Sequence, residues 1–384
     1  MTRLKNFIEK IQSRFVSAAR DDRSAQLISI KTALHSLSVA YGGWMGIRAH
    51  LYEKDVLSSK RLPCRVVSIG NIVAGGTGKT PMTVLVAQMI KDMGYHVAVI
   101  SRGYRGRMEN RGGVVSDGNR IINGPQDAGD EPYLMARLLK GIPVVVGSRR
   151  YESGMMAVKR FHPDVIVLDD AFQHMRLERD LNLVLLDSRA PLGNGHLLPR
   201  GLLREPKSAL NRAHAIVYTR CRHAADASAF DAVPGGKRPV FYTAHTQIIR
   251  AERLEDGTLL NDATEISVLQ GKKAVAFCGL ADNQQFFDGL EQAGCVLVHT
   301  FSFADHHLYG CRDLNRIAET AREKAADLLI TTYKDFVKIE KKESWPVALM
   351  AVDVTIQVLG DQRRFFNFIS RALKVPDNGL PKNK

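Results

Sequence analysis

The chain has 384 residues, of which 45% are hydrophobic and 24% charged, a composition typical of a globular protein long enough for two domains. Its five cysteines include no Cys-x-x-Cys pair, so neither a disulfide framework nor a zinc site is indicated. The formal net charge of +14 indicates an anionic partner: nucleic acid, a membrane surface or a phosphorylated substrate. The start of the chain lacks a signal-peptide pattern, and a reducing, cytoplasmic compartment is expected.

The first expected unit, residues 1–62, is basic and helical. Its stretch 32–47 carries no acidic or basic residue except His35, and it includes Tyr41 and Trp44. This stretch is too short and too polar to span a bilayer, but its aromatic and flanking cationic residues suit a helix lying in a membrane interface. An ordinary helix packed on its own domain fits the pattern equally well.

A glycine-rich turn follows, between an apolar strand at 66–69 and a helical pattern at 82–90. This order is the context of a phosphate-binding loop, in which Lys79 supplies charge for the β and γ phosphates and Thr80 can hold Mg²⁺. The strict motif has glycine at position 73, where this chain has valine, and a glycine-rich turn that only packs is the alternative. The residues expected to bind ATP are Ala74, Gly75, Gly76, Thr77, Gly78, Lys79, Thr80 and Pro81.

Strands and helices alternate along the rest of the chain. The expected elements that follow the first helix are a strand at 96–100, a helix at 131–140, a strand at 143–146, a helix at 151–160 and strands at 165–168, 183–186 and 215–218. Two short strands at 240–249 and 257–260 then precede a second block: a strand from 273, a helix at 283–293, a strand at 295–299, a helix at 314–325 and a strand at 327–331. Alternation of this kind indicates a mainly parallel sheet covered on both faces.

The sequence therefore predicts an α/β protein with a P-loop NTPase-like core of mainly parallel strands. A second, smaller α/β domain is joined to that core by a short two-stranded β linker. The expected ranges are 63–233 for the core, 234–262 for the linker, 263–374 for the smaller domain and 375–384 for a disordered tail.

Two adjacent carboxylates, Asp169 and Asp170, end the apolar strand at 165–168. In phosphate-loop enzymes an acid at the tip of a neighbouring strand holds Mg²⁺ or its water shell. Adjacent carboxylates raise each other's pKa unless a cation lies between them, so the pair favours a metal site over a helix cap. Asp187 ends another apolar strand and is a weaker candidate.

Asp130 opens the expected helix at 131–140, where an aspartate is usually a helix cap. A hydroxyl that accepts a phosphoryl group needs a carboxylate to take its proton, and Asp130 is a candidate for that role. In the second block, Asp305 precedes His306 and His307, and such a pair can orient a base or form part of a plain loop.

Polar and basic loops follow several of the expected strands. Gln173 and His174 come directly after the paired aspartates, and arginines alternate with glycines at 102–107. Arg149 and Arg150 follow the strand at 143–146. Because parallel sheets place their sites at the carboxyl ends of the strands, these side chains are expected to contact phosphate or an anionic substrate.

Together these segments resemble one family, the tetraacyldisaccharide 4′-kinases of lipid A biosynthesis, the LpxK type. The matching segments are GGTGKTP (75–81), SRGYRG (101–106), GDEP (129–132), VGSRR (146–150), LDDAFQHMRL (168–177), LLPRGLLREP (197–206), FADHH (303–307) and TTYKDFVKI (331–339). The resemblance implies transfer of the γ-phosphate of ATP, with Mg²⁺, to the 4′-hydroxyl of an acylated glucosamine disaccharide 1-phosphate, giving lipid IVA. It also implies a peripheral enzyme on the cytoplasmic face of the inner membrane of a Gram-negative bacterium, with no nucleic-acid partner.

The resemblance further implies roles for residues. Asp130 corresponds to the family's catalytic base and His306 to its partner, with His307 as the alternative partner. Lys79 and Thr80 bind phosphate and Mg²⁺. The metal-side acids are Asp169 and Asp170, and the expected substrate or phosphate contacts are Tyr104, Glu131, Arg150, Gln173, His174 and Arg204.

A competing class is the P-loop switch ATPase of the partition or metal-chaperone type, which also carries a GGxGKT loop. That group typically has a second lysine just before the two glycines, where this chain has Ala74. A nucleic-acid-dependent ATPase is a third possibility that rests on charge alone, because the chain lacks interleaved aromatic and basic residues that stack bases.

Overall fold

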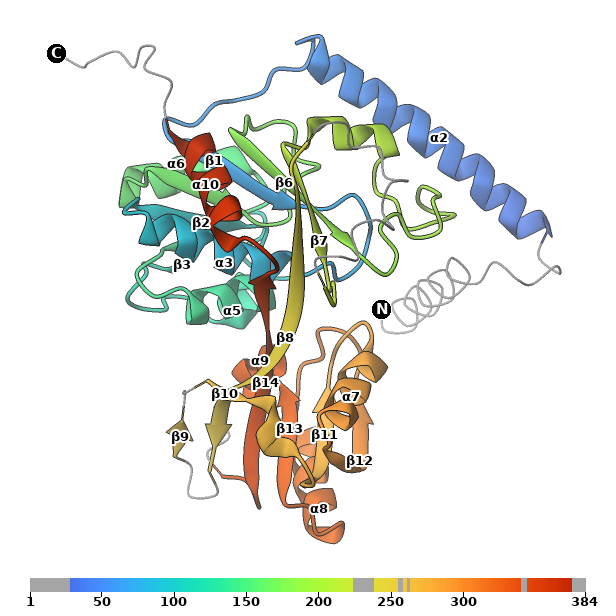
Figure 1. Ribbon diagram of the computed structural model, residues 1–384, viewed down its shortest axis with the longest axis vertical. Coiled ribbons are helices and arrows are strands. Elements are labelled where there is room, and N and C mark those ends of the chain that lie inside the picture. The colour runs from blue at the N-terminus through green and yellow to red at the C-terminus, as the bar shows by residue number, and fades with distance from the viewer. Residues whose placement is uncertain (1–27, 224–237, 255–257, 261–262, 340–343, 375–384) are drawn as a thin grey trace.

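The first unit of the molecule is a core of mainly parallel strands with helices on both faces (Figure 1). The computed structural model describes residues 28–223, 238–254, 258–260, 263–339 and 344–374. The strands of this unit are β1 (Arg65–Gly70), β2 (Val97–Ser101), β3 (Gly113–Ser116), β4 (Val144–Val146), β5 (Val165–Leu168), β6 (Leu181–Asp187) and β7 (Ala215–Thr219). Its helices are α2 (Ile28–Glu53), α3 (Lys79–Asp92), α4 (Pro125–Ala128), α5 (Asp130–Leu138), α6 (Arg150–Phe161) and the 3-10 helix η2 (Lys207–Arg212).

The second unit is smaller and lies at the other end of the molecule (Figure 1). Its strands are β8 (Val240–Arg253), β9 (Leu259–Leu260), β10 (Thr264–Glu265), β11 (Lys273–Cys278), β12 (Val296–Ser302), β13 (Leu328–Thr332) and β14 (Ala348–Val358). Its helices are α7 (Asn283–Gln292), α8 (Cys311–Glu323), α9 (Tyr333–Ile339) and the 3-10 helix η4 (Ile266–Leu269), and the chain continues into α10 (Gln362–Leu373).

One continuous sheet runs through both units in the order β12-β11-β13-β14-β8-β7-β6-β1-β5-β2-β4-β3, with β9 and β10 paired to β8. Neighbouring strands are parallel except at β3–β4, β8–β14 and the short pairings of β8. This arrangement confirms the predicted α/β class with a mainly parallel sheet. Parallel neighbours need crossover helices, which explains the alternation visible in the sequence.

Alternating residues of each strand build the two faces of the first sheet. Val97 and Val99 of β2 belong to the buried cluster that includes the inner side of α3, whereas Ala98 and Ile100 belong to the cluster on the opposite face, beside α6. Successive side chains of a strand point to opposite faces of the sheet, and helices cover both faces here. Every residue of such a strand is therefore buried, which explains why these strands are apolar throughout. The carboxyl ends of β1, β2 and β5 therefore meet at one edge, where the loops predicted to carry the chemistry begin.

The two units are joined by a long two-stranded ribbon. The start of β8 pairs with β7 in the first unit, and β8 then runs antiparallel to β14 from Thr243 to Arg253. The expected linker range 234–262 therefore supplies one strand of the ribbon, and the second strand comes from 348–358. Pairing with β14 also extends β8 beyond the end expected at residue 249.

Helix α10 returns to the first unit, although its residues fall in the range expected for the smaller domain. Phe365, Ile369 and Leu373 are buried in the same cluster as the inner face of α3. These residues are spaced by four and form an apolar stripe along α10. The stripe packs against the part of that cluster beside β8, where the ring of Phe365 contacts that of Phe241. The expected disordered tail at 375–384 and the first 27 residues lie outside the described residues.

Candidate active site

The glycine-rich loop links β1 to α3, which begins at Lys79. Gly75 (φ 124°) and Gly78 (φ 79°) have left-handed backbone conformations that favour glycine. A Cβ atom at Gly78 would also lie 2.7 Å from Nε2 of His245 on β8, whereas none of the described atoms lies within 4 Å of one added at Gly75 or Gly76. The loop thus presents open backbone in front of a helix N-terminus, which is an anion-binding arrangement.

Hydrogen bonds hold this loop in place. The backbone N–H of Ala74 donates to the carbonyl of Leu202 at 2.7 Å, and Nδ2 of Asn71 donates to Oγ1 of Thr77 at 3.0 Å. Nζ of Lys79 donates to the carbonyl of Gly75 at 3.4 Å. Its ammonium group therefore lies over the loop, at the position where phosphate oxygens would bind.

Asp170, one of the two predicted metal-side acids, lies among cations. Its carboxylate accepts two hydrogen bonds from Nη1 of Arg204, both at 3.1 Å, and lies 3.9 Å from Nζ of Lys79. Burial would raise the pKa of Asp170, but the charges of Lys79 and Arg204 outweigh burial, and the pKa is lowered. The structure therefore joins Lys79, Asp170 and Arg204 in one charged group.

Asp169, the other acid, is only 2% exposed and accepts hydrogen bonds from Oγ1 of Thr83 and Oγ of Ser101, both at 3.1 Å. Burial, with the nearby charges of Glu131 and Asp170, raises the pKa of Asp169 to about 7. A divalent cation bound beside Asp169 would favour its ionised form.

The oxygen donors at the end of β5 fit Mg²⁺. Among the described residues no three His, Cys, Asp or Glu side chains form a metal cage. Mg²⁺ does not need one, since it is usually held by one or two carboxylates together with substrate phosphates. Thr80, in the first turn of α3, and the two aspartates supply the hard oxygen ligands that this ion prefers.

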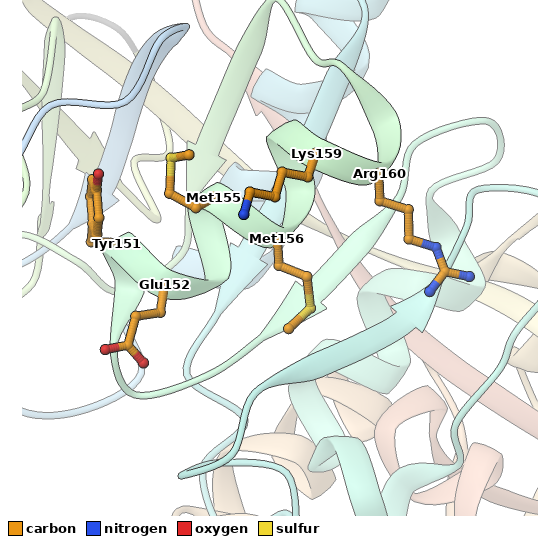
Figure 2. A pocket seen from close by; sticks show the side chains of 6 residues that line it. All are labelled: Tyr151, Glu152, Met155, Met156, Lys159 and Arg160. Atoms are coloured by element: carbon orange, nitrogen blue, oxygen red, sulfur yellow. The ribbon is translucent and has the colours of Figure 1, made fainter.

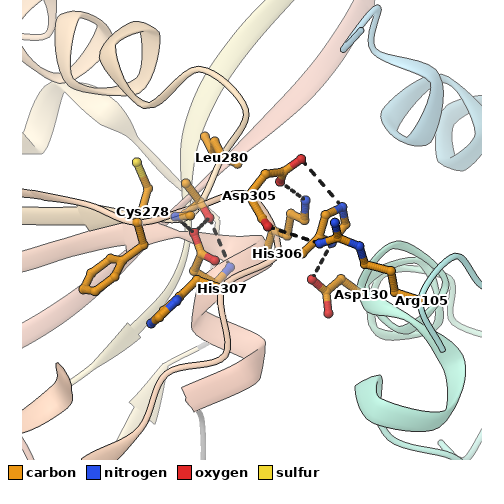
Figure 3. Close-up of polar contacts among 12 residues, drawn as sticks. Arg105, Asp130, Cys278, Leu280, Asp305, His306 and His307 are labelled. Carbon is orange, nitrogen blue, oxygen red and sulfur yellow. Dashed lines mark hydrogen bonds and ion pairs between the residues drawn. The ribbon is translucent and has the colours of Figure 1, made fainter. Parts of the chain in front are cut away.

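A second cluster surrounds Asp130, the first residue of α5, and joins the two units (Figure 3). Nδ1 of His306 lies 2.9 Å from Oδ2 of Asp130, and Nζ of Lys338 on α9 lies 3.0 Å from the same oxygen. His307 instead contacts Asp313 at 3.0 Å, so His306 is the histidine that reaches Asp130. Burial would raise the pKa of Asp130, but His306 and Lys338 outweigh it and lower that pKa.

The loop that carries His306 is held by further contacts. Nη1 of Arg105 donates to the carbonyl of Asp305 at 3.4 Å, and Nζ of Lys334 lies 3.2 Å from the Asp305 carboxylate. The ring of Tyr104 lies edge-on to that of His306, with centroids 6.2 Å apart. Arg105, Asp170 and His306 all have positive φ without being glycine, a backbone conformation that costs about 1–3 kcal/mol each and that concentrates at functional sites.

Arg150, a predicted phosphate contact, begins α6 and is buried. Its Nη1 donates to the carbonyl of Gly147 at 2.6 Å, whereas its Nε is buried without a hydrogen-bond partner in the part of the chain that the structure describes. Burial lowers the pKa of Arg150 to about 10, so the side chain stays charged at neutral pH. Its orphaned N–H group suits an anionic ligand.

Gln173 and His174 lie in the loop after the paired aspartates. Nε2 of Gln173 donates to the carbonyl of Asn71 at 2.7 Å, which ties this loop to the end of β1. Burial and nearby arginines lower the pKa of His174 to about 4, so its ring is neutral at pH 7. His174 could therefore contact a substrate through a hydrogen bond and not through charge.

Helix α2 packs beside this loop at the outer edge of the first unit (Figure 1). Oη of Tyr41 donates to the carbonyl of Arg204 at 2.7 Å, and Nη2 of Arg48 donates to that of Gln173 at 3.2 Å. Leu37 and Trp44 of the same helix are 58% and 63% exposed. None of the described helices has both the length and the apolar character needed to cross a membrane.

Two other features lie apart from these clusters. A hollow of about 630 Å³ runs along α6 (Figure 2), but none of its lining residues is a predicted site residue. The hollow is lined by Tyr151, Glu152, Met155, Met156, Lys159 and Arg160.

Asp187, the weaker metal candidate, pairs with Arg189 at 2.8 Å and with Arg220.

Motif reasoning did not assign Lys338, which contacts Asp130, or Asp335, which contacts Lys338. Both lie in the segment 331–339, which contributed to the resemblance without a role for its individual residues. Their spacing of three on α9 places them side by side, with Nζ of Lys338 3.1 Å from Oδ1 of Asp335. The spacing of three residues in the sequence predicts the contact between Lys338 and Asp335. It does not predict the contact between Lys338 and Asp130, which depends on the packing of α9 against α5.

The fold and site define a class: an α/β nucleotide-binding protein of the P-loop type, with paired acids beside the loop and a second unit over its edge. The model of the family "Tetraacyldisaccharide-1-P 4'-kinase" (LpxK) matches residues 30–374. The chain therefore belongs to the LpxK family, which confirms the resemblance predicted from the motifs.

Relatives and a solved structure agree with this membership. Two proteins called tetraacyldisaccharide 4'-kinase are similar to the chain. The protein of Desulfatibacillum aliphaticivorans is 43% identical over 89% of this chain and 92% of its own length. That of Geobacter metallireducens is 44% identical over 79% and 87%. The crystal structure of LpxK from Aquifex aeolicus in complex with ATP covers 90% of this chain and 100% of its own, with 30% identity and a TM-score of 0.72.

The raised pKa of Asp169 predicts a pH-dependent response to Mg²⁺. Between its ordinary pKa and about 7, folded Asp169 keeps a proton that Mg²⁺ must displace. We expect apparent Mg²⁺ affinity in the presence of ATP to be about tenfold weaker at pH 6 than at pH 8. The measurement is the difference in Tm between samples with ATP and Mg²⁺ and samples with ATP and EDTA, at both pH values.

Asp169→Asn should flatten this pH dependence, because the titrating carboxyl is gone. Asp117→Asn is the control, since Asp117 lies exposed in a turn after β3 and should keep the wild-type response. Equal pH dependence in wild type and Asp169→Asn would contradict the assignment of Asp169 to the metal side.

Proposed function

We propose that this chain transfers the γ-phosphate of ATP to the 4′-hydroxyl of an acylated glucosamine disaccharide 1-phosphate, giving lipid IVA. Family membership supports the reaction and the substrate class. The observation that supports the proposal most is the contact of 2.9 Å between Nδ1 of His306 and Oδ2 of Asp130, two side chains whose chemistry suits them to accept a proton. A nucleotide site alone would not need such a pair.

The loop and the end of β5 would hold the nucleotide. Backbone N–H groups between Ala74 and Pro81 would surround the phosphates, with Lys79 supplying a positive charge. Mg²⁺, when bound, would offset charge on the phosphate oxygens, and Thr80, Asp169 and Asp170 are the residues that would hold it. Contacts to substrate or phosphate are proposed for Tyr104, Glu131, Arg150, Gln173, His174 and Arg204.

Asp130 and His306 act in this proposal as one proton acceptor for the 4′-hydroxyl. A single oxygen of Asp130 contacts both His306 and Lys338, so the carboxylate is held in place and its negative charge can stabilise a protonated imidazole. Nε2, the other ring nitrogen of His306, lies 3.8 Å from Oδ2 of Asp305.

The competing function is ATP hydrolysis by a P-loop switch protein. Ala74 stands where the switch group has its second lysine, and the pair Asp130–His306 would have no task in ATP-driven dimerisation. The acceptor-site geometry therefore favours the kinase.

An assay of ATP consumption with and without the acylated disaccharide 1-phosphate separates the two functions. We expect lipid-dependent consumption with one phosphate transferred per ATP, and we expect Asp130→Asn to lower kcat by ~10²–10⁴-fold because the proton acceptor is lost. Hydrolysis that depends on protein dimerisation or on DNA, without transfer to the lipid, would overturn the proposal.

We also propose that the protein works as a peripheral enzyme on the cytoplasmic face of the inner membrane, without a nucleic-acid partner. The support is α2, on which Leu37, Trp44 and Ile47 are spaced by seven and three residues and share an exposed side. Other residues of the same helix, Tyr41 and Arg48, contact the loops of the candidate site. An exposed apolar helix side next to the loops of Gln173 and Arg204 would bring the enzyme to a lipid substrate.

Replacing Trp44 and Ile47 together by serine should weaken membrane binding. Each side chain contributes about 1.5–3 kcal/mol when it leaves water, so partitioning should fall by at least about tenfold. The measurement is sedimentation with phosphatidylglycerol vesicles. The control replaces Ile121 and Ile122 by serine, because these exposed apolar residues lie in the turn after β3. Unchanged partitioning of the Trp44/Ile47 variant would leave only the packing role of α2.

A further inference from the structure

Lys338 on α9 is a buried lysine whose three donors all have acceptors. Its Nζ lies 3.0 Å from Oδ2 of Asp130 and 3.1 Å from Oδ1 of Asp335, and it donates to the carbonyl of His307 at 3.3 Å. The Lys338 side chain is 4% exposed. Since a lysine ammonium has three N–H groups, this one is fully used within the protein and cannot also bind a phosphate.

Asp335 fixes the other side of this ammonium within the second unit. Its side chain is fully buried, and its Oδ2 accepts hydrogen bonds from Oγ1 of Thr332 at 2.7 Å and from the backbone N–H of Gly279 at 2.9 Å. These partners lie at the ends of β13 and β11, which pair with each other in the second unit. The position of the Lys338 ammonium is therefore set by the second unit, whereas Asp130 belongs to the first.

Apolar packing brings the two helices together around this polar contact. Leu134 of α5 belongs to the same buried cluster as Phe336 and Val337 of α9. The cluster places the first residue of α5 opposite α9 but does not orient the Asp130 carboxylate. That orientation depends on His306 and Lys338, which contact the same carboxylate oxygen.

The charges in this cluster do not balance without Lys338. Asp130 and Asp335 are two buried carboxylates on either side of one ammonium. Removal of the ammonium would leave both acids facing each other across a site with little solvent, which favours protonation of Asp130. Lys338 thus keeps the Asp130 carboxylate ionised as well as aligned.

We propose that Lys338 is a positioning residue for phosphoryl transfer: its ammonium ties the Asp130 carboxylate to α9 and so aligns the Asp130–His306 pair only when the two units are packed together. This inference rests on the proposed kinase function. It adds a residue that touches neither nucleotide nor acceptor and that acts through Asp130.

Lys338→Met tests this role in the full-length enzyme. We expect kcat/KM for the acylated disaccharide to fall by ~10²-fold at neutral pH, because the carboxylate is displaced. The acidic limb of the pH profile should move to higher pH by ~1 unit or more, because loss of a neighbouring positive charge raises the pKa of Asp130. Lys338→Arg retains the charge and should keep the limb near its wild-type position.

Asp335→Asn should move the acidic limb in the opposite direction, to lower pH, because it removes a negative charge beside the same ammonium. Opposite shifts in Lys338→Met and Asp335→Asn cannot arise from a general loss of folding. The control is Lys91→Met, since Lys91 donates to the carbonyl of Lys140 on the surface of the first unit and should leave the profile unchanged. Circular dichroism and Tm of each variant confirm that it is folded.

The outcomes separate the inference from the function on which it rests. Wild-type enzyme that transfers no phosphate to the acylated disaccharide would refute the kinase function itself. Active wild-type enzyme whose acidic limb is unchanged in folded Lys338→Met, or moves the same way in Asp335→Asn, would refute the role of Lys338 alone.

Discussion

The contact of Asp130 with His306 and Lys338 is the interaction on which the candidate site depends. Asp130 lies on the first unit, and both partners lie on the second. A buried carboxylate that loses such partners typically costs about 3–5 kcal/mol, so the contact favours the packed arrangement of the two units. The proposed acceptor pair is therefore complete only when both units are in place, and the nucleotide loop alone does not make the site.

The ribbon of β8 and β14 and the return of α10 explain how this contact is supported. The ribbon joins the sheets edge to edge, and α10 anchors the end of β14 on the first unit through Phe365 and Ile369. His245 of the same ribbon lies against Gly78 of the phosphate-binding loop. The ribbon that connects the units therefore lies against the phosphate-binding loop, and a shift of the ribbon would change the surroundings of Gly78.

The sequence predicts those parts of the molecule that follow from local patterns. The loop before α3, the acids after β5 and the α/β class rest on short spacings and on the period of apolar residues, and the confirmed family membership agrees with them. The roles assigned to single residues stay predictions. Within the site, the structure brings Lys79 and Asp170, which follow the neighbouring strands β1 and β5, together with Arg204 of the loop after β6.

The remaining features depend on contacts between distant parts of the chain. His306 lies 176 residues from Asp130, and no spacing rule selects it over His307. From the sequence, Lys338 cannot be told from a surface lysine of a short helix, because its burial depends on the packing of α9 against α5. Helix α10 has an ordinary apolar stripe, and only the uncovered edge of the first core determines where it packs. Sequence patterns predict an element and its buried side, but not its partner.

A double-mutant cycle across the two units tests the central claim most directly. The variants are Asp130→Asn, His306→Gln and their combination, and the quantity measured is kcat/KM for the acylated disaccharide. If the two residues act as one proton acceptor, the double variant should lose about as much activity as the more damaged single variant. Losses that multiply in the double variant would show independent roles and would contradict the account.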